Sequence, residues 1–329
     1  MKTVLVTGAC GFIGTCLCHR LRAEGHTVIG IDNLSRRGSE LNALELSGIG
    51  VDLHRVDASN APKLFYLASQ LGSIDAVFHL SAQVAVTSSY ANRQVDFYDN
   101  ALASFNVIEA VKRYMPEAYC LYASTNKVYG HITVSEPVGV GQPTDPYTPY
   151  GVSKAAGEMY WLEYGRPELG LTTCSLRQSC IYGHHQFGVE DQGWVAWFTI
   201  ANLLGETITL YGDGMQVRDL LFVDDLVDLY LECWDKRLTG AWPVGGGPAN
   251  AINLRDCLAL IEEKTGQPFA EVRHEPTRPG DQPYFVADMD WTPGAGLDWR
   301  PSTAIPNGVD RMIAWIRDNE DSIRRAVKR

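Results

Sequence analysis

The chain has 329 residues, 45% of them hydrophobic and 20% charged, and its formal net charge is −11. This composition is typical of a globular protein with a substantial core, in one large domain or two lobes. The negative charge argues against nucleic acid or an anionic membrane surface as a partner. No apolar run approaches the ~20 residues that would cross a bilayer, so we expect no membrane partner either.

The eight cysteines include no Cys-x-x-Cys pair, and several lie in apolar segments typical of strands or helices. Reduced thiols in a cytoplasmic protein fit this pattern better than disulfides or zinc. Residues 1–4 run directly into a strand-like segment without a small-residue cleavage site, so we expect no signal peptide. The eight histidines are scattered, and their spacing predicts no metal site.

Short β-rich runs alternate with helix-like stretches through the first half of the chain. The pattern predicts strands at 2–7, 27–31, 51–56, 74–80, 118–124 and 171–177. Val, Ile, Leu and Phe dominate several of these runs, as strands buried on both faces require. The alternation indicates β-α-β crossovers and therefore an α/β fold of the Rossmann type, a doubly wound parallel sheet with helices on both sides.

Beyond residue 180, Gly, Pro and Trp become frequent and the loops lengthen. We expect a smaller C-terminal substrate-binding lobe beside the carboxyl ends of the strands, where ligands bind in open α/β sheets. Residues 217–235 are predicted to be a strand and a helix that return to the first lobe. The predicted division is 1–178 with about 216–246 for the Rossmann lobe, and 179–215 with 247–329 for the second lobe.

A glycine-rich turn follows the first predicted strand. Gly8, Gly11 and Gly14 are spaced by three, and a helix is expected to begin near Phe12. Glycines let the backbone approach a pyrophosphate, whose charge meets the helix N-terminus. The alternative is a tight turn without a ligand, but the surrounding β-α-β pattern favours a dinucleotide site. Its expected members are Gly8, Gly11, Phe12, Ile13 and Gly14.

An aspartate at the end of the second predicted strand indicates which dinucleotide binds. Asp32 follows Gly14 by eighteen residues, where a carboxylate can bind the adenosine ribose and repel a 2′-phosphate. NAD is therefore favoured over NADP. Asn33, the residue after Asp32, is also expected to contact the cofactor. Arg36 and Arg37 keep NADP open, although we interpret them as solvated loop charges.

Further cofactor contacts are expected where the later strands end. Asp57 follows the third strand and could accept a bond from the adenine amine, or simply cap its loop. The small residues after His79 would let backbone lie against the dinucleotide, and Asn100 is expected to hold its neighbours by hydrogen bonds. The expected contacts are Leu80, Ala82, Gln83, Asp57 and Asn100.

Tyr150 and Lys154 are four residues apart, so they share one face of a helix. An ammonium ~4 Å from a phenolate stabilises it by roughly 4 kcal/mol at an effective dielectric of about 20. That attraction could lower a tyrosine pKa from about 10 towards about 7. Such a tyrosine can take a proton from a sugar hydroxyl, which beside a nicotinamide is alcohol oxidation.

From the glycine motif to Gly280-Asp281-Gln282, these residues resemble the extended short-chain dehydrogenase/reductase family of nucleotide-sugar epimerases and dehydratases. The resemblance implies that Thr125, within Ala123–Gly130, hydrogen-bonds the reacting sugar oxygen and helps the proton reach Tyr150. It also implies that Lys154 holds the nicotinamide ribose and that NAD stays tightly bound.

The residues after Thr125 argue against one branch of that family. Sugar 4,6-dehydratases carry an Asp-Glu pair there as general acid and base, whereas this chain has Asn126-Lys127. Because neither side chain readily performs carboxylate chemistry, dehydration is not expected.

A finer resemblance is to the CDP-paratose (CDP-tyvelose) 2-epimerase subfamily. It is carried by residues 124–130, 32–38 and above all 186–198. The resemblance implies oxidation at C2 of a CDP-linked hexose to a keto sugar, which turns in the site and is reduced on its other face. One departure is His184-His185, where Pro-Arg or Gly-Arg is usual.

The resemblance also implies a nucleotide-diphosphate sugar site. Arg218 and Arg278 would pair with phosphates, Tyr211 would lie near the base and Asp281 near the ribose; ordinary ion pairs are the alternative for the arginines. His185 could contact a phosphate, contact the sugar or lie in a solvated loop. Trp194 could contact the substrate or be a packing residue. The other expected substrate contacts are Asn126, Lys127, Gln186, Asp191 and Gln192.

Two apolar helical stretches, 97–113 and 150–164, are predicted to be core or, by resemblance, a homodimer interface. Two other functions stay open. A UDP-hexose 4-epimerase would need the same Thr125, Tyr150 and Lys154 with the sugar turned differently. A catalytically silent NAD-binding regulator is disfavoured, because all three of those residues are present.

Overall fold

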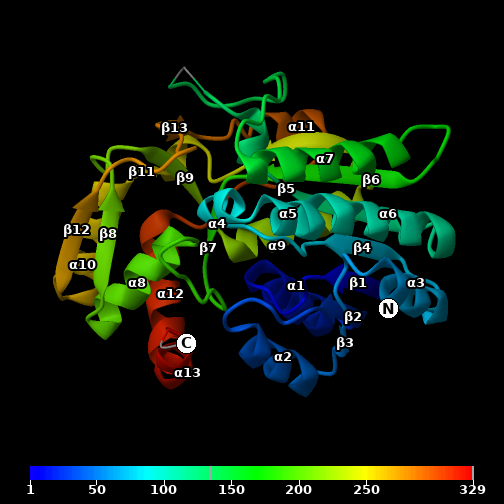
Figure 1. Ribbon diagram of the computed structural model, residues 1–329, viewed down its shortest axis with the longest axis horizontal. Helices are drawn as coiled ribbons and strands as arrows, with labels where there is room; N and C mark the ends of the chain where they lie inside the picture. The colour runs from blue at the N-terminus through cyan, green and yellow to red at the C-terminus, as the bar shows by residue number, and fades with distance from the viewer. Residues whose placement is uncertain (133–134, 328–329) are drawn as a thin grey trace.

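The computed structural model describes residues 1–132 and 135–327. Its centre is a seven-stranded sheet in the order β10-β6-β5-β4-β1-β2-β3, with every neighbouring pair parallel (Figure 1). The strands are β1 (Thr3–Thr7), β2 (Thr27–Asp32), β3 (Asp52–Arg55), β4 (Ala76–His79), β5 (Tyr119–Thr125), β6 (Thr172–Gln178) and β10 (Gly240–Val244). The six predicted strands and the Rossmann-type fold are confirmed, and β10 is a seventh strand that was not predicted.

Alternate side chains of each strand point to opposite faces of the sheet. In β1, Val4 and Val6 join a core with Leu17 of α1, whereas Leu5 joins a second core with Val107 of α6. The helices that pack with the first core include α1 (Phe12–Ala23), α2 (Ser39–Gly48) and α9 (Val223–Asp235). Those that pack with the second are α3 (Ala61–Gln70), α6 (Ala103–Tyr114) and α7 (Pro149–Tyr164).

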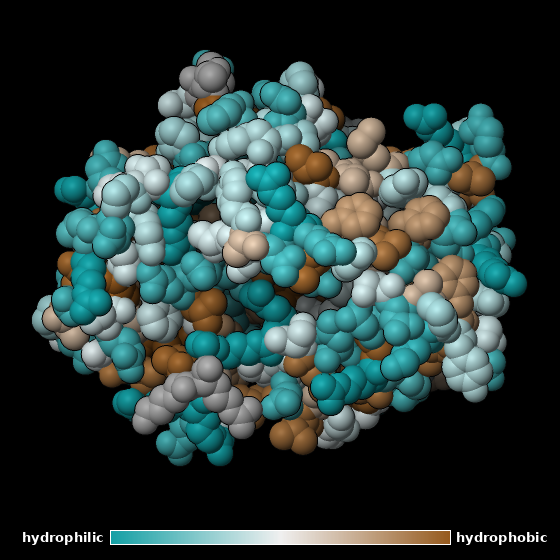
Figure 2. Space-filling view, viewed as in Figure 1, coloured by the Kyte–Doolittle hydropathy of each residue, from teal (hydrophilic) through white to brown (hydrophobic). Residues whose placement is uncertain are grey.

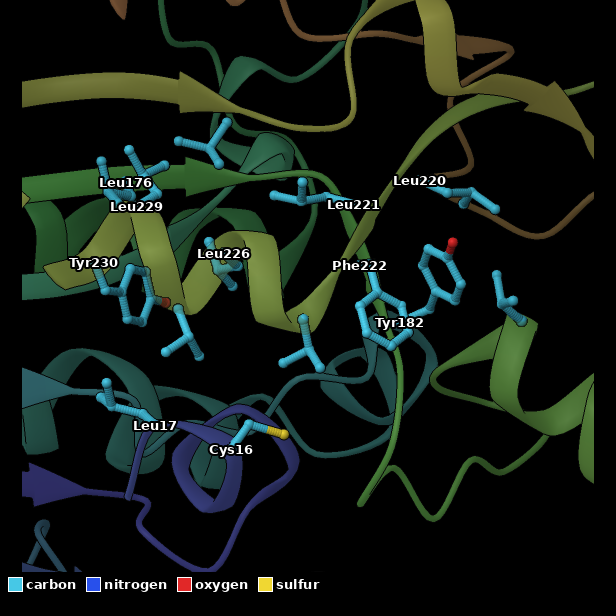
Figure 3. Packing of buried hydrophobic residues seen from close by; sticks show 14 of the residues in the cluster. Cys16, Leu17, Leu176, Tyr182, Leu220, Leu221, Phe222, Leu226, Leu229 and Tyr230 are labelled. Atoms are coloured by element: carbon cyan, nitrogen blue, oxygen red, sulfur yellow. The ribbon is translucent and has the colours of Figure 1, made fainter. Parts of the chain in front are cut away.

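The segment 217–235 divides between the two parts of the molecule. Figure 3 shows Leu226, Leu229 and Tyr230 of α9 between the sheet and Leu17 of α1. The helix therefore returns to the first lobe as predicted. The strand does not, because β9 (Val217–Phe222) pairs with β7 (Cys180–Tyr182), β11 (Ala251–Asn253) and β13 (Tyr284–Phe285) in a separate sheet.

The remaining elements build the smaller C-terminal part. A parallel pair, β8 (Thr207–Tyr211) and β12 (Glu271–Glu275), lies beside α8 (Trp194–Leu204) and α10 (Leu254–Thr265). The chain continues into α11 (Trp291–Gly294), α12 (Ile305–Asp318) and α13 (Glu320–Val327).

Three short helical segments of the first half of the chain precede α6: α4 (Val86–Ala91), α5 (Arg93–Asp96) and a π-helix (Phe97–Leu102). Within the described ranges, every helix is too short or too polar to span a bilayer.

The strand order reverses between β1 and β4, since the chain builds outward from β1 in both directions. Open α/β sheets bind ligands at the carboxyl ends of the strands at such a point. The glycine turn after β1, the end of β4 and the start of α7 all belong to this region.

Candidate active site

The glycine turn between β1 and α1 has no room for side chains. Gly8 has a φ of +69°, and a Cβ there would lie 2.6 Å from the Ser81 backbone nitrogen. A Cβ on Gly14 would lie 2.1 Å from the Gly8 carbonyl oxygen. The N-cap residue of α1, Gly11, offers no side-chain cap, and the first turn holds no acidic residue. The first backbone N–H groups of α1 are therefore available to an anion.

A cavity of about 220 Å³ extends from this turn to the start of α7. Its wall holds most of the predicted cofactor contacts: Gly8, Gly11, Phe12, Ile13, Gly14, Asp32, Asn33, Asp57, Leu80, Ala82, Tyr150 and Lys154. The glycine turn and the catalytic pair, distant in sequence, thus face one space.

Asp32 ends β2 and is held in place by backbone groups. Its carboxylate accepts hydrogen bonds from the N–H of Cys10 at 3.0 Å and of Leu34 at 2.8 Å. Asp57 accepts bonds from Asn33 Nδ2 and from the Ser59 backbone and hydroxyl. Asp57 therefore caps its loop, which was the simpler of its two predicted roles, while it also borders the cavity.

Gln83 and Asn100 stand behind the cavity wall rather than in it. Asn100 is fully buried; its Oδ1 accepts from the Gln83 backbone N–H at 2.8 Å, and its Nδ2 donates to Asp96 and Ser153. Asn100 thus joins the loop after β4 to α7, which agrees with the supporting role predicted for it.

Tyr150 lies in the first turn of α7, whose N-cap hydroxyl, Thr148 Oγ1, accepts from the Gly151 N–H at 3.0 Å. The Tyr150 phenol is buried, and the Thr125 hydroxyl at the end of β5 lies close enough to it to lower its pKa. Lys154 follows one turn later, also buried, with its ammonium 4.2 Å from the centre of the Tyr122 ring. Tyr150 and Lys154 therefore line the cavity together, and Thr125 is buried near the phenol but outside the cavity wall.

The expected acidification of Tyr150 by Lys154 is wrong for the protein without ligands. Burial raises the pKa of Tyr150 to about 12, against the lowering effects of the Thr125 hydroxyl and the Arg36 charge. Burial also lowers the pKa of Lys154 to about 7, opposed by the carboxylates of Glu158 and Asp96. Desolvation of both groups outweighs the attraction that the sequence argument considered.

Two residues of the cavity wall carry buried polar atoms without partners, and these atoms test whether a ligand fits the cavity. Ser124 Oγ and Gln186 Oε1 are buried and have no hydrogen-bond partner within the described residues, and both residues line the cavity. Buried polar atoms without partners are costly. A ligand rich in hydroxyl and amide groups, such as a dinucleotide with a sugar beside it, would satisfy them. Ser124 was not among the predicted contacts, because its neighbour Thr125 carried the motif.

Arg36 is a second residue that the sequence interpretation missed. It was expected to be a solvated loop charge, but it lines the cavity and donates a hydrogen bond to Gln192 Oε1. Arg37 also lines the cavity, but its side chain is exposed and contacts the Val327 carbonyl at 3.5 Å. Sequence position alone did not distinguish these adjacent arginines.

The predicted substrate contacts divide into two groups. His185, Gln186 and Gln192 line the cavity. The others lie outside its wall: Asn126, Lys127, Asp191, Trp194, Tyr211, Arg218, Arg278 and Asp281.

A buried polar cluster connects the second group to Thr125. Arg218 is 5% exposed and pairs with Asp281 at 2.6 Å. The side chains of Asn126 and Lys127 both reach Gln282 Oε1 at 3.3 Å, and the Lys127 N–H donates to Thr125 Oγ1 at 3.3 Å. Arg218 therefore has an ion-pair partner, as the simpler interpretation allowed, but in the interior and not on the surface.

Three other predicted contacts have partners of their own. The Arg278 guanidinium stacks 3.8 Å from the centre of the Tyr211 ring and donates to the Glu190 carbonyl at 3.1 Å, while Asp191 lies 3.8 Å away. Trp194 packs against the core and donates to Cys180 Sγ at 3.5 Å. His185 faces Glu45 with its Nδ1 at 3.3 Å, which removes the solvated-loop alternative.

Comparison with known proteins places this site in a family. The sequence profile of the NAD dependent epimerase/dehydratase family matches residues 4–243. The chain belongs to this family. It is an NAD-dependent enzyme of the isomerase class, and the glycine turn, the carboxylate of Asp32 and the two orphaned polar atoms fit that cofactor.

Similarity to family members extends over nearly the whole chain. The CDP-paratose 2-epimerase of Salmonella typhi is 35% identical and covers 95% of this chain and 98% of its own. The UDP-glucose 4-epimerase of Thermus thermophilus in complex with NAD is 32% identical with a TM-score of 0.86, over 96% of this chain and 99% of its own. The UDP-glucose 4-epimerase of Thermotoga maritima with UDP-glucose is 28% identical with a TM-score of 0.86, over 97% of this chain and 99% of its own.

Proposed function

We propose that this protein inverts C2 of a CDP-linked hexose through a transient keto sugar. The observation that supports this most is that Tyr150 and Lys154 line the cavity with Thr125 buried near the phenol. Asn126-Lys127 stands where a dehydratase has carboxylates. This arrangement supports reversible alcohol oxidation and offers no carboxylate pair to remove water.

The side chains divide the work as follows. Tyr150 takes the proton of the reacting hydroxyl, and Thr125, which lies near the phenol, holds the same oxygen. NAD, when bound, would supply a reversible hydride acceptor. Because burial raises the pKa of Tyr150, a positive charge beside the phenol would favour its action as a base.

Two observations support C2 and CDP over the alternatives. The relative with the matching 2-epimerase activity is 35% identical over 95% of the chain. Gln186 and Gln192, from the stretch that distinguishes the 2-epimerase subfamily, line the cavity. The second candidate is a UDP-hexose 4-epimerase, which the fold similarity to two such enzymes favours. A silent NAD-binding regulator has least support, since the catalytic residues meet.

Proton NMR of the reaction distinguishes these functions. The protein would be incubated with CDP-, UDP- and GDP-hexoses while the anomeric, H2 and H4 signals are followed. We expect inversion at C2 of the CDP sugar, and a deuterium placed at C2 should stay there, because hydride leaves and returns without exchange with water. Inversion at C4 with C2 unchanged would refute the proposed position, and no conversion would favour the regulator.

The Tyr150→Phe variant tests the proposed base. We expect kcat to fall by about 10²–10⁴-fold, the range for loss of a general base, while NAD remains bound. A Tyr90→Phe variant removes a hydroxyl from an exposed tyrosine of α4 and serves as the matched control. Full activity of Tyr150→Phe would contradict the assignment.

We further propose that NAD stays bound through the cycle, that the protein is a homodimer and that it works in the cytoplasm. Loss of reduced cofactor would leave the keto sugar without a hydride donor. Exposed apolar residues on α7 and the neighbouring π-helix, among them Met159, Tyr160 and Phe97, support the dimer. All eight cysteines are unpaired thiols, which supports a reducing compartment.

A further inference from the structure

Three side chains from different elements converge beside the cofactor cavity. His19 lies on α1, Glu45 on α2, and His185 in the loop after β7. His19 Nε2 is 2.9 Å from Glu45 Oε1, and His185 Nδ1 is 3.3 Å from Glu45 Oε2. The donor atoms of the three residues all lie within 4.8 Å of one another. His185, which is at least 140 positions from the other two in the chain, thus joins them to present two nitrogens and a carboxylate to one point.

Local geometry holds this cluster together. His185 has a φ of +62°, in the left-handed region that non-glycine residues seldom adopt. Its side chain is only 11% exposed, and its ring stacks at 5.2 Å on that of His19. His19 Nε2 and His185 Nδ1 are both buried, yet neither has hydrogen-bond geometry to a partner in the described part of the chain. An unusual backbone conformation therefore directs a nitrogen without a hydrogen bond towards a carboxylate.

We propose that His19, Glu45 and His185 bind a divalent transition-metal ion of the zinc type. Two imidazoles and one carboxylate match the ligands such ions prefer, whereas Mg²⁺ and Ca²⁺ favour oxygen ligands alone. One ion would satisfy both imidazole nitrogens and the carboxylate together. Three protein ligands leave a fourth position for water or a ligand.

An ion bound at this cluster would affect the structure of the neighbouring cavity wall. His185 and its neighbour Gln186 belong to the cavity wall, while α1 carries the glycine turn at its start. An ion held by all three residues would fasten the loop after β7 to α1 and α2. The next residue back, His184, is already anchored, because its Nε2 lies 2.8 Å from Asp224 and its Nδ1 3.5 Å from Cys16. The ion would therefore stabilise one wall of the NAD site.

Titration with Co²⁺ tests the site without relying on activity. The NAD-loaded protein, made without a polyhistidine tag and freed of metals by a chelator, would be titrated at micromolar Co²⁺ while visible absorption is recorded. We expect one ion per chain, a visible band that Zn²⁺ displaces, and a higher midpoint of thermal unfolding with Zn²⁺. Absence of saturable binding at these concentrations would overturn the proposal and leave an ion-paired cluster.

Variants assign the ligands. Glu45→Gln and His185→Ala should each weaken Co²⁺ binding by at least about tenfold, and the Zn²⁺-dependent rise in unfolding midpoint should disappear. His54→Ala is the matched control, because His54 also lies beside a carboxylate, 3.2 Å from Asp52, but away from the cluster. If His185→Ala does not fold, Co²⁺ binding by the nearly isosteric Glu45→Gln variant tests the site instead. Unchanged Co²⁺ binding in Glu45→Gln would refute the site.

Discussion

At the scale of single residues, burial controls the charge of the side chains around the proposed substrate site. The Lys127 ammonium is enclosed beside Gln282, and burial lowers its pKa to about 8, with the Arg218 charge acting in the same direction. Asp281 opposes this shift. Lys127 is therefore positively charged at neutral pH but close to losing that charge.

The pH dependence of kcat/KM should reveal this titration, because kcat/KM reports groups of the free enzyme. Lys127 is charged below its pKa and neutral above it, so kcat/KM for the nucleotide sugar should fall as the pH rises through about 8. The fall should approach about tenfold, typical of a hydrogen bond to a charged group. Lys127→Met should be less active at pH 7 and lose this fall. An unchanged profile in the variant would show that another group titrates.

Arg36 and Arg37 offer a comparison between adjacent residues of one type. Arg36 bonds the neutral side chain of Gln192 in the cavity wall, so its charge is available to a diphosphate. Arg36→Ala should raise the dissociation constant for NAD about tenfold, whereas Arg37→Ala, which removes an exposed side chain that contacts the Val327 carbonyl, should raise it less. Fluorescence titration of protein freed of dinucleotide measures both. A loss of affinity for NADP alone would instead assign Arg36 to a 2′-phosphate.

At the scale of elements, the β1–α1 unit combines tight packing with an anion site. Backbone atoms approach so closely that Gly14 meets the carbonyl of Gly8. The same close approach leaves the start of α1 without a side-chain cap. Packing and cofactor binding therefore depend on the same missing side chains.

A pair of helical glycines tests this dependence. In Gly14→Ala the new methyl would lie 2.1 Å from backbone oxygen, so we expect the free energy of unfolding to fall by about 1–3 kcal/mol and NAD binding to be lost. Gly48→Ala in α2 meets no heavy atom within 4 Å and should be neutral or slightly stabilising. Urea unfolding and NAD content after purification measure the two effects. Normal NAD content in Gly14→Ala would contradict the described turn.

At the scale of the whole molecule, apolar side chains gather on one face. Figure 2 shows brown and tan residues over α7 and α6. Val152, Met159 and Tyr160 of α7 are 51%, 70% and 46% exposed, and Phe97 of the neighbouring π-helix is 52% exposed. The other side of the same helices supplies buried core residues such as Val107 and Trp161. Both predicted roles of these helices, core and interface, can therefore hold on opposite faces.

Light scattering after size-exclusion chromatography tests the proposed homodimer. We expect the wild type to elute as a dimer and Met159→Arg to shift towards the monomer, since a charge would be desolvated in an apolar interface. Tyr66→Arg, at a position 72% exposed on α3, should remain dimeric. A monomeric wild type at micromolar concentration would refute the dimer.

Local patterns in the sequence were sufficient for much of this protein. Six strands of the main sheet, the glycine turn and the start of α1 follow from runs of apolar residues and from spacings within one turn. Tyr150 and Lys154 were identified by their helical spacing and Thr125 by resemblance, and their motifs are short and contiguous. Such features depend on neighbours within a few residues, which a sequence shows directly.

Other features depend on residues far apart in the chain. Tertiary structure decided that β9 joins a second sheet, that Arg36 is half-buried beside Gln192, and that His185 meets His19 and Glu45. It also decided the charge state of Tyr150, because desolvation depends on every group that covers the phenol. Burial and long-range contact arise only when the chain folds, so no local pattern could predict them.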